Sequence, residues 1–187
     1  MTDPALPPIV RTVSVRWAPD EAFRRFTAGF GEWWPHSSHS VGGAHVKAVV
    51  FETRVGGRIY EDHHDGKRFE WGVVQEWEPP RRVVFSWHPG RPERTAQTVE
   101  LLFTAEGGGT KLRLTSSDWH RWGDGAARAH RGYDLGWRWV LSYWAGQRTT
   151  PFMLALGGLM KVMQFAQRFR GGQAAIIART EREIAAG

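Results

Sequence analysis

The sequence predicts an α+β fold in which helices cover one face of a curved antiparallel sheet. Several stretches alternate between apolar and polar residues, as strands with one buried face do. Short turns join most of these stretches, and they favour antiparallel pairing because parallel strands need long crossover connections. After these stretches, aromatic and aliphatic residues recur at helical spacing. We therefore expect about six or seven strands packed around one long helix.

The first elements are a strand over residues 9–17 and a helix that begins at Pro19. Apolar and polar side chains alternate along the strand. Pro19 presets φ for a first helical turn, and the two acidic residues after it suit the positive end of a helix. Gly29 and Gly31 are expected to end this helix. A short second turn then precedes a polar loop over residues 35–44.

Six strands are expected in the middle of the chain, and a helix follows them. Tight turns separate the strands, among them Asp65-Gly66 and the glycine run 107–109. Residues 117–132 are expected to be irregular or weakly helical, and the long helix is expected over residues 131–147. The six strands are expected over residues 46–53, 58–63, 69–77, 82–87, 98–105 and 110–116.

The chain is expected to form one domain over residues 1–148 and a helical extension over residues 149–187. The extension holds a helix that starts at Pro151 and another over residues 173–185. Three interpretations are open: packing on its own domain, a homodimer contact, and binding to a membrane surface. The residues for the last two are Phe152, Leu156, Leu159 and Met163 for a homodimer, and Lys161, Arg168 and Arg170 for anionic lipid.

The composition narrows the classes of function. Cysteine is absent, which rules out disulfides and cysteine-ligated zinc. No signal peptide and no apolar stretch of membrane-spanning length occurs, so a cytoplasmic location is expected. The net charge of +6 comes from arginines dispersed among acidic residues, so nucleic-acid binding is not expected. No phosphate-binding glycine loop or dinucleotide fingerprint occurs, and no cofactor is expected.

Tryptophan is the most distinctive component of the chain, with 11 among 187 residues. Most of these tryptophans lie at alternate positions of expected strands or on the stripe of the long helix. Side chains this large and rigid either fill a core or frame a hollow. We interpret them as framing a hollow, which indicates binding of a small molecule. The alternative is that they pack together as an ordinary core.

Local strings carry a family resemblance through their order and spacing. They are residues 54–60, Asp65-Gly66 and residues 71–87, with Trp33-Trp34, residues 107–112 and Gly136-Trp137 in matching places. On these strings, residues 9–147 resemble the START-like, or SRPBCC, superfamily, and within it the homologues of the activator of heat-shock-protein-90 ATPase. The resemblance implies a helix-grip fold whose sheet and long C-terminal helix enclose a cavity for apolar ligands. The sequence departs from the eukaryotic co-chaperone, since no chaperone-contacting domain is expected in it and the extension follows residue 148.

The leading hypothesis is that a small apolar or amphipathic ligand binds in this cavity. The alternatives are a protein-interaction role like that of the co-chaperone and a cyclase-like enzyme. The candidate ligand-binding residues are Trp33, Trp34, His36, Phe51, Arg58, Tyr60, Phe69, Trp71, Trp87, Phe103, Tyr133, Trp137 and Leu141. Among them, Arg58, His36 and Tyr133 are the groups expected to orient a polar end of the ligand.

Catalytic and metal sites have little support in the sequence. No nucleophile motif such as Gly-x-Ser-x-Gly occurs, so no catalytic residue is assigned. His36 and His39 have the spacing of metal ligands, and residues 61–65 are rich in carboxylates and imidazoles. His63 and His64 would point to opposite faces of a strand, however, so no metal site is expected.

Overall fold

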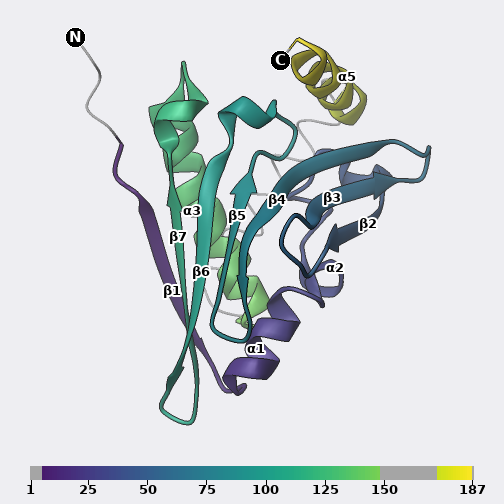
Figure 1. The fold of residues 1–187 in the computed structure, drawn as a ribbon. Helices are drawn as coiled ribbons and strands as arrows, with labels where there is room; N and C mark the ends of the chain where they lie inside the picture. Colours follow the sequence, from purple (N-terminus) through teal and green to yellow (C-terminus); the bar gives the residue numbers. More distant parts are fainter. Residues whose placement is uncertain (1–5, 148–171, 187) are drawn as a thin grey trace.

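The computed structural model describes residues 6–147 and 172–186 as a curled antiparallel sheet of seven strands that packs against a long helix (Figure 1). The strands are β1 (Ile9–Val15), β2 (Val46–Phe51), β3 (Arg58–His63), β4 (Arg68–Glu78), β5 (Arg82–Trp87), β6 (Gln97–Glu106) and β7 (Gly109–Ser117). The helices are α1 (Pro19–Phe26), α2 (Phe30–Trp33), α3 (Ala126–Trp144) and α5 (Gly172–Ala185). Three 3₁₀ turns are η1 (Gly43–His45), η2 (Glu93–Thr95) and η3 (Trp119–Trp122).

Strands β2 to β7 form a meander, and β1 pairs with β7 at its edge. Its order is β1-β7-β6-β5-β4-β3-β2, and all neighbours are antiparallel. β1 pairs along its whole length with β7, from Ile9 opposite Ser116 to Val15 opposite Thr110. The prediction of an α+β, helix-grip fold with six or seven antiparallel strands is therefore confirmed.

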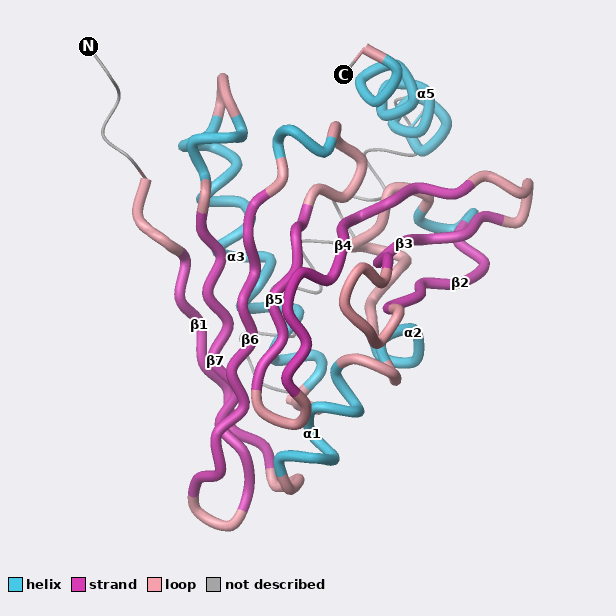
Figure 2. The backbone as a smooth tube through the Cα atoms, viewed as in Figure 1, coloured by secondary structure: helices cyan, strands magenta, loops and turns pink. Residues whose placement is uncertain are grey.

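Irregular pairing in one half of the sheet accompanies its curvature. The register shifts between β2 and β3, between β3 and β4, and between β4 and β5, whereas the other pairs are regular. Such bulges bend a strand and increase its twist. At Gly72 in β4 a Cβ atom would lie 1.7 Å from the Ser86 carbonyl oxygen, so only glycine allows this approach. The half formed by β2, β3 and β4 curls away from the plane of β1, β7 and β6 (Figure 2).

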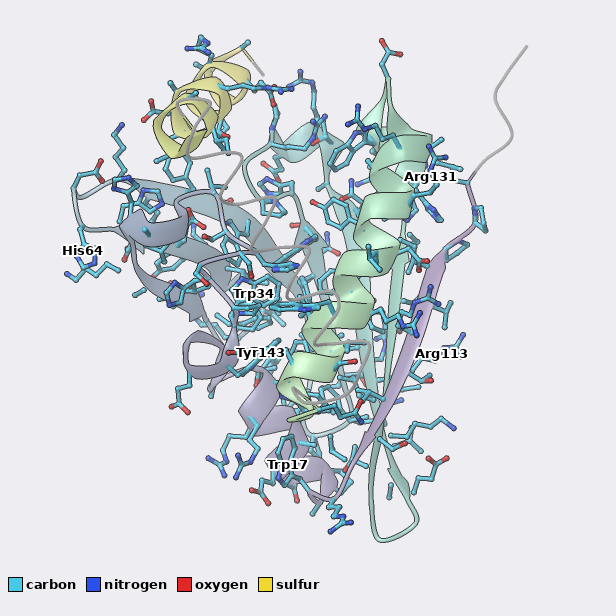
Figure 3. All side chains as sticks on the ribbon, turned by 180° about the vertical axis from the view of Figure 1, so that it is seen from behind. Trp17, Trp34, His64, Arg113, Arg131 and Tyr143 are labelled. Carbon is cyan, nitrogen blue, oxygen red and sulfur yellow. The ribbon has the colours of Figure 1, made fainter. Side chains whose placement is uncertain are left out.

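Helix α3 lies along the inner face of the sheet, and α1 and α2 lie at one end of the sheet (Figure 3). The apolar side chains of β4, β5, β6 and β7 meet the stripe of α3 in one core. Its rings include Trp71 and Phe85 from the sheet, Phe26 and Phe30 from the short helices, and Trp144 from α3. The rings meet mostly edge to face, with Phe26 at 5.4 Å from Trp144 and Phe51 at 5.5 Å from Phe85.

The observed elements differ from the prediction mainly at α3, which begins at Ala126 rather than at residue 131. Gly123 and Gly125 adopt positive φ values of 74° and 82° and turn the chain into the helix. The helix expected from Pro151 lies outside the described residues. Within the described residues, no helix combines the length and apolarity needed to cross a bilayer.

Candidate functional site

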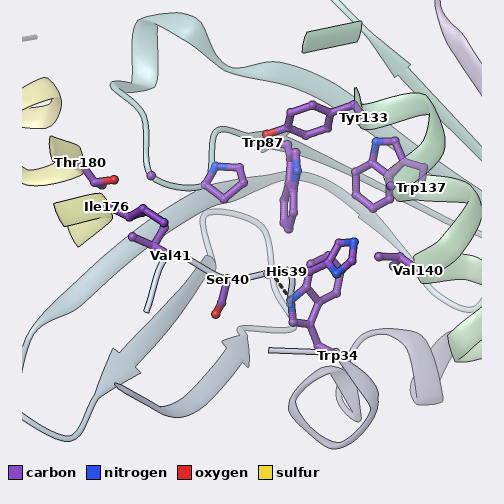
Figure 4. Close-up of a pocket in the computed structure, with 13 residues that line it drawn as sticks. Trp34, His39, Ser40, Val41, Trp87, Tyr133, Trp137, Val140, Ile176 and Thr180 are labelled. Atoms are coloured by element: carbon purple, nitrogen blue, oxygen red, sulfur yellow. Dashed lines mark hydrogen bonds between the residues drawn. The ribbon is translucent and has the colours of Figure 1, made fainter. Parts of the chain in front are cut away.

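A pocket of about 310 Å³ opens between α3, the end of β5, the loop after α2 and helix α5 (Figure 4). We call it the inner pocket. Its walls are mostly apolar, and its polar groups come from few side chains. The residues that line it are Trp34, His39, Ser40, Val41, Trp87, Pro89, Gly90, Tyr133, Gly136, Trp137, Val140, Ile176 and Thr180.

Helix α3 forms one wall of the inner pocket through Tyr133, Gly136, Trp137 and Val140. These positions are spaced as i, i+3, i+4 and i+7, so they lie on one face of the helix. The glycine makes a gap in this stripe, because a Cβ atom at Gly136 would have no neighbour within 4 Å. The wall therefore carries aromatic rings at Tyr133 and Trp137 and a gap at Gly136.

Three indole rings form the base of the inner pocket. Trp34 lies 5.6 Å from Trp87 and 6.5 Å from Trp137, and Trp87 lies 5.4 Å from Trp137, measured between ring centroids. Trp71 stands behind this triad, 5.4 Å from Trp34 and 5.5 Å from Trp87. Because each ring is supported by others, the base is rigid and presents apolar surface toward the pocket.

A buried carboxylate holds the loop that brings His39, Ser40 and Val41 to the inner pocket. Glu61 of β3 accepts hydrogen bonds from the backbone N–H groups of Val41 at 3.0 Å and Gly42 at 2.7 Å. His63 Nε2 lies 2.6 Å from the same carboxylate. A Cβ atom at Gly42 would lie 2.2 Å from His63 Nε2, so the loop can approach only with glycine there. At the start of the loop, the Trp34 indole N–H donates to the His39 carbonyl oxygen at 2.8 Å.

Two titratable side chains face the inner pocket, and both are uncharged near neutral pH. Burial lowers the pKa of His39 to about 4. Its ring stacks on Trp139 at 4.5 Å, and its Nδ1 lies 2.9 Å from the Ser38 hydroxyl. Burial raises the pKa of Tyr133 above its usual value.

The Tyr133 hydroxyl has no hydrogen-bond partner among residues 6–147 and 172–186. Figure 4 shows its hydroxyl end pointing away from α3, above Trp87. A neutral hydroxyl can both donate and accept, so it is suited to a polar atom of a bound molecule.

Four of the residues proposed from the sequence line the inner pocket together: Trp34, Trp87, Tyr133 and Trp137. Trp33, Phe51, Trp71 and Phe103 belong instead to the core. Phe69 is buried with Val41 and Ile177 in a small cluster beside the pocket.

The remaining proposed residues lie away from the inner pocket. Tyr60 is covered by the Arg68 guanidinium at 3.9 Å, and Arg58 pairs with Glu70 at 3.3 Å. His36 is exposed on the loop. Leu141 borders a different pocket between β1 and α3, which the charged side chains of Arg11 and Arg138 also line.

The pocket residues that the sequence analysis did not include come from several distant segments. Ser40, Pro89 and Gly90 show no pattern of their own that marks a site, whereas Val140 lies on the apolar stripe of the long helix. Ile176 and Thr180 belong to the helix expected over residues 173–185, and both line the pocket. His39 was considered as a metal ligand; among the described residues, no group of three or more His, Asp or Glu side chains converges as a metal site.

Comparison with known proteins gives one family and a set of similar structures. The model of the family described as "Activator of Hsp90 ATPase homolog 1-like protein" matches residues 16–142. No curated protein sequence matches the chain.

Three solved structures illustrate the similarity. The self-sacrificing resistance protein CalC from Micromonospora echinospora is 25% identical with a TM-score of 0.56, over 75% of this chain and 93% of that protein. The Aha1 dimer from Colwellia psychrerythraea is 18% identical with a TM-score of 0.52, over 73% of this chain and 91% of that protein. An anthrahydroquino-gamma-pyrone synthase is 32% identical with a TM-score of 0.49, over 70% of this chain and 88% of that protein.

Proposed function

The chain belongs to the family of activator of Hsp90 ATPase homolog 1-like proteins, and from this premise we propose that it binds a small hydrophobic or amphipathic molecule in the inner pocket. Trp34, Trp87 and Trp137 supply the apolar contact surface, and Tyr133 orients a polar atom of the ligand.

The observation that carries this proposal is the hollow itself. Its volume of about 310 Å³ lies at the lower end of the range of small-molecule sites. Aromatic walls with a few polar groups are also typical of such sites. If the eleven tryptophans packed together without a void, no such volume would exist. A core of that kind would favour a purely structural role for the rings.

A large exposed apolar surface would favour the protein-interaction alternative. The exposed large apolar side chains of the described residues are Val10, Val55, Leu135 and Ile184. They belong to β1, the turn between β2 and β3, α3 and α5, so they are scattered over separate segments. This distribution favours the small ligand. A cyclase-like activity stays a prediction.

The test uses the neutral fluorescent probe N-phenylnaphthylamine and a variant that fills the inner pocket. A Cβ atom at position 136 would have no neighbour within 4 Å, the backbone there does not have a positive φ, and leucine favours helix more than glycine does. We expect the probe to bind the parent protein and Gly136→Leu to weaken binding by roughly tenfold or more, equivalent to about 1.4 kcal/mol.

The matched control is Ala127→Leu, which adds a larger side chain at an exposed position of the same helix outside the pocket. It should bind the probe as the parent protein does. Absence of probe binding to the parent, or equal binding to Gly136→Leu and the parent, would contradict the proposed function.

A further inference from the structure

A second hollow, of about 560 Å³, adjoins the inner pocket at the first half of α3. We call it the outer groove. It shares His39, Tyr133 and Gly136 with the inner pocket, so the two hollows are adjacent. The remaining residues that line the outer groove are Arg91, Trp122, Asp124, Gly125, Arg128, Ala129, Gly132 and Arg179.

The outer groove carries an excess of positive charge. Its lining includes three arginines and a single carboxylate, that of Asp124. Arg179 is paired with Glu183 at 2.7 Å. Within residues 6–147 and 172–186, neither Arg91 nor Arg128 has a carboxylate within ion-pair distance. In the part of the chain that the structure describes, two guanidinium groups at this site therefore lack an anionic partner.

Arg91 is held in place by an aromatic ring and by two hydrogen bonds. Its guanidinium lies 4.0 Å from the centroid of the Trp122 ring, and it donates to the Trp122 carbonyl oxygen at 3.4 Å and to the Thr95 hydroxyl at 3.3 Å. Its positive charge also acts on Tyr133, where it opposes the effect of burial on the pKa of the hydroxyl. The cation of the outer groove thus lies close to the polar group of the inner pocket.

Two glycines leave open space on the face of α3 that borders the hollows. Gly132 and Gly136 lie one turn apart on α3, and a Cβ atom at either position would have no neighbour within 4 Å. Neither has a positive φ, so the backbone does not require glycine there. Glycine inside a helix lowers stability relative to alanine. A larger residue at either position would occupy this space, so the two glycines keep this face of the helix open.

We propose that the ligand is an amphipathic anion, whose apolar body occupies the inner pocket and whose anionic oxygen group lies in the outer groove against Arg91 and Arg128. Arginine suits such a group because its planar guanidinium presents several N–H donors to carboxylate, sulfonate or phosphate oxygens. The N-terminal end of α3, where Gly125 lines the groove, adds partial positive charge. This inference rests on the proposed function, because it names the class of ligand for the same site.

The experiment compares two probes that share an aromatic skeleton and differ in charge. Anilinonaphthalene sulfonate carries a sulfonate, and N-phenylnaphthylamine is its neutral counterpart; both fluoresce in apolar surroundings. The variants are the double substitution Arg91→Gln/Arg128→Gln and the control Arg131→Gln, an exposed arginine of α3 that does not line the groove. Circular dichroism and thermal unfolding show that each variant is folded.

We expect the parent protein to bind the sulfonate several-fold more tightly than the neutral probe. The double variant should weaken sulfonate binding by roughly tenfold, as expected for the loss of two partly exposed charge contacts. Its affinity for the neutral probe should stay unchanged, and Arg131→Gln should leave both affinities unchanged. Added salt should weaken the binding of the sulfonate probe and leave the binding of the neutral probe unchanged.

Two kinds of result would contradict the inference. Equal affinity of the parent for the two probes, or equal loss of sulfonate binding in the double variant and in Arg131→Gln, would overturn the anionic ligand and leave the proposed function standing. Failure of both probes to bind the parent would overturn the proposed function and this inference with it.

Discussion

At the scale of single residues, Glu61 and His63 show how a buried polar pair shapes an apolar pocket. Both side chains are fully buried, and neither lines the pocket. The carboxylate instead accepts the N–H groups of the loop that supplies His39, Ser40 and Val41. These two backbone donors and the adjacent His63 ring compensate the cost of removing the carboxylate from water. The position of the pocket wall thus depends on a group outside the pocket.

His39 predicts a dependence of stability on pH. Its pKa is lowered from 6.5 to about 4, so the folded state takes up this proton at a lower pH than the unfolded state. The contribution of the neutral ring to stability is complete above about pH 6.5, decreases as the pH falls, and is absent below about pH 4. In His39→Gln, the free energy of unfolding should vary less with pH across this window. Urea unfolding at a series of pH values measures the difference.

The control for this prediction is His36→Gln, at an exposed position of the same loop. It should keep the pH dependence of the parent protein. If His39→Gln and the parent lose stability in parallel between pH 6.5 and pH 4, the burial of His39 does not have the assigned effect.

At the scale of elements, α3 shows that space and backbone conformation act separately on a glycine. Gly125 and Gly132 both leave room for a Cβ atom, but only Gly125 has a positive φ. Gly132→Ala should therefore raise the free energy of unfolding by about 0.5–1 kcal/mol. Gly125→Ala should lower it by about 1 kcal/mol, because the left-handed conformation disfavours a side chain. Chemical denaturation measures both changes.

The two substitutions should also separate stability from binding. Gly132→Ala places a methyl group in the outer groove, so it should weaken binding of the sulfonate probe while it stabilises the fold. A fall in stability on Gly132→Ala would mean that the position is occupied by other parts of the protein and that the groove is not open there.

The elements also show which signals a sequence carries. β3 and β5 begin and end at the predicted residues, because alternation and turn chemistry both mark their bounds. The start of α3 was missed, since residues 126–130 have no apolar stripe. The three alanines in that segment are strong helix formers and are the signal that would have located it.

At the scale of the whole molecule, α5 completes the inner pocket from far along the chain. Ile177 packs with Val41 and Phe69, and Lys67 pairs with Glu181 at 2.7 Å. Ile177→Ala should weaken the docking of α5 by about 2 kcal/mol. Because Ile176 and Thr180 line the pocket, the affinity for N-phenylnaphthylamine should fall several-fold. Hydrogen exchange should increase in residues 175–185 and stay unchanged in β6.

The control here is Ile184→Ala, because Ile184 is 41% exposed. It should leave exchange and probe binding unchanged. An equal increase of exchange in β6 and α5 after Ile177→Ala would indicate that α5 does not open separately from the sheet.

The sequence by itself determined the class of fold and the strands, since residue alternation and turn residues are local and survive without knowledge of contacts. It also indicated that aromatic rings from β5 and α3 face one another, and Trp87, Tyr133 and Trp137 do line the same pocket. Their role in ligand binding stays a prediction. Only the tertiary structure decided which rings border empty space. Trp71 and Trp34 lie 5.4 Å apart, yet Trp71 is covered on all sides and Trp34 is open to the pocket. That difference depends on the curl of the sheet and the docking of a loop and a helix, which periodicity along the chain does not encode.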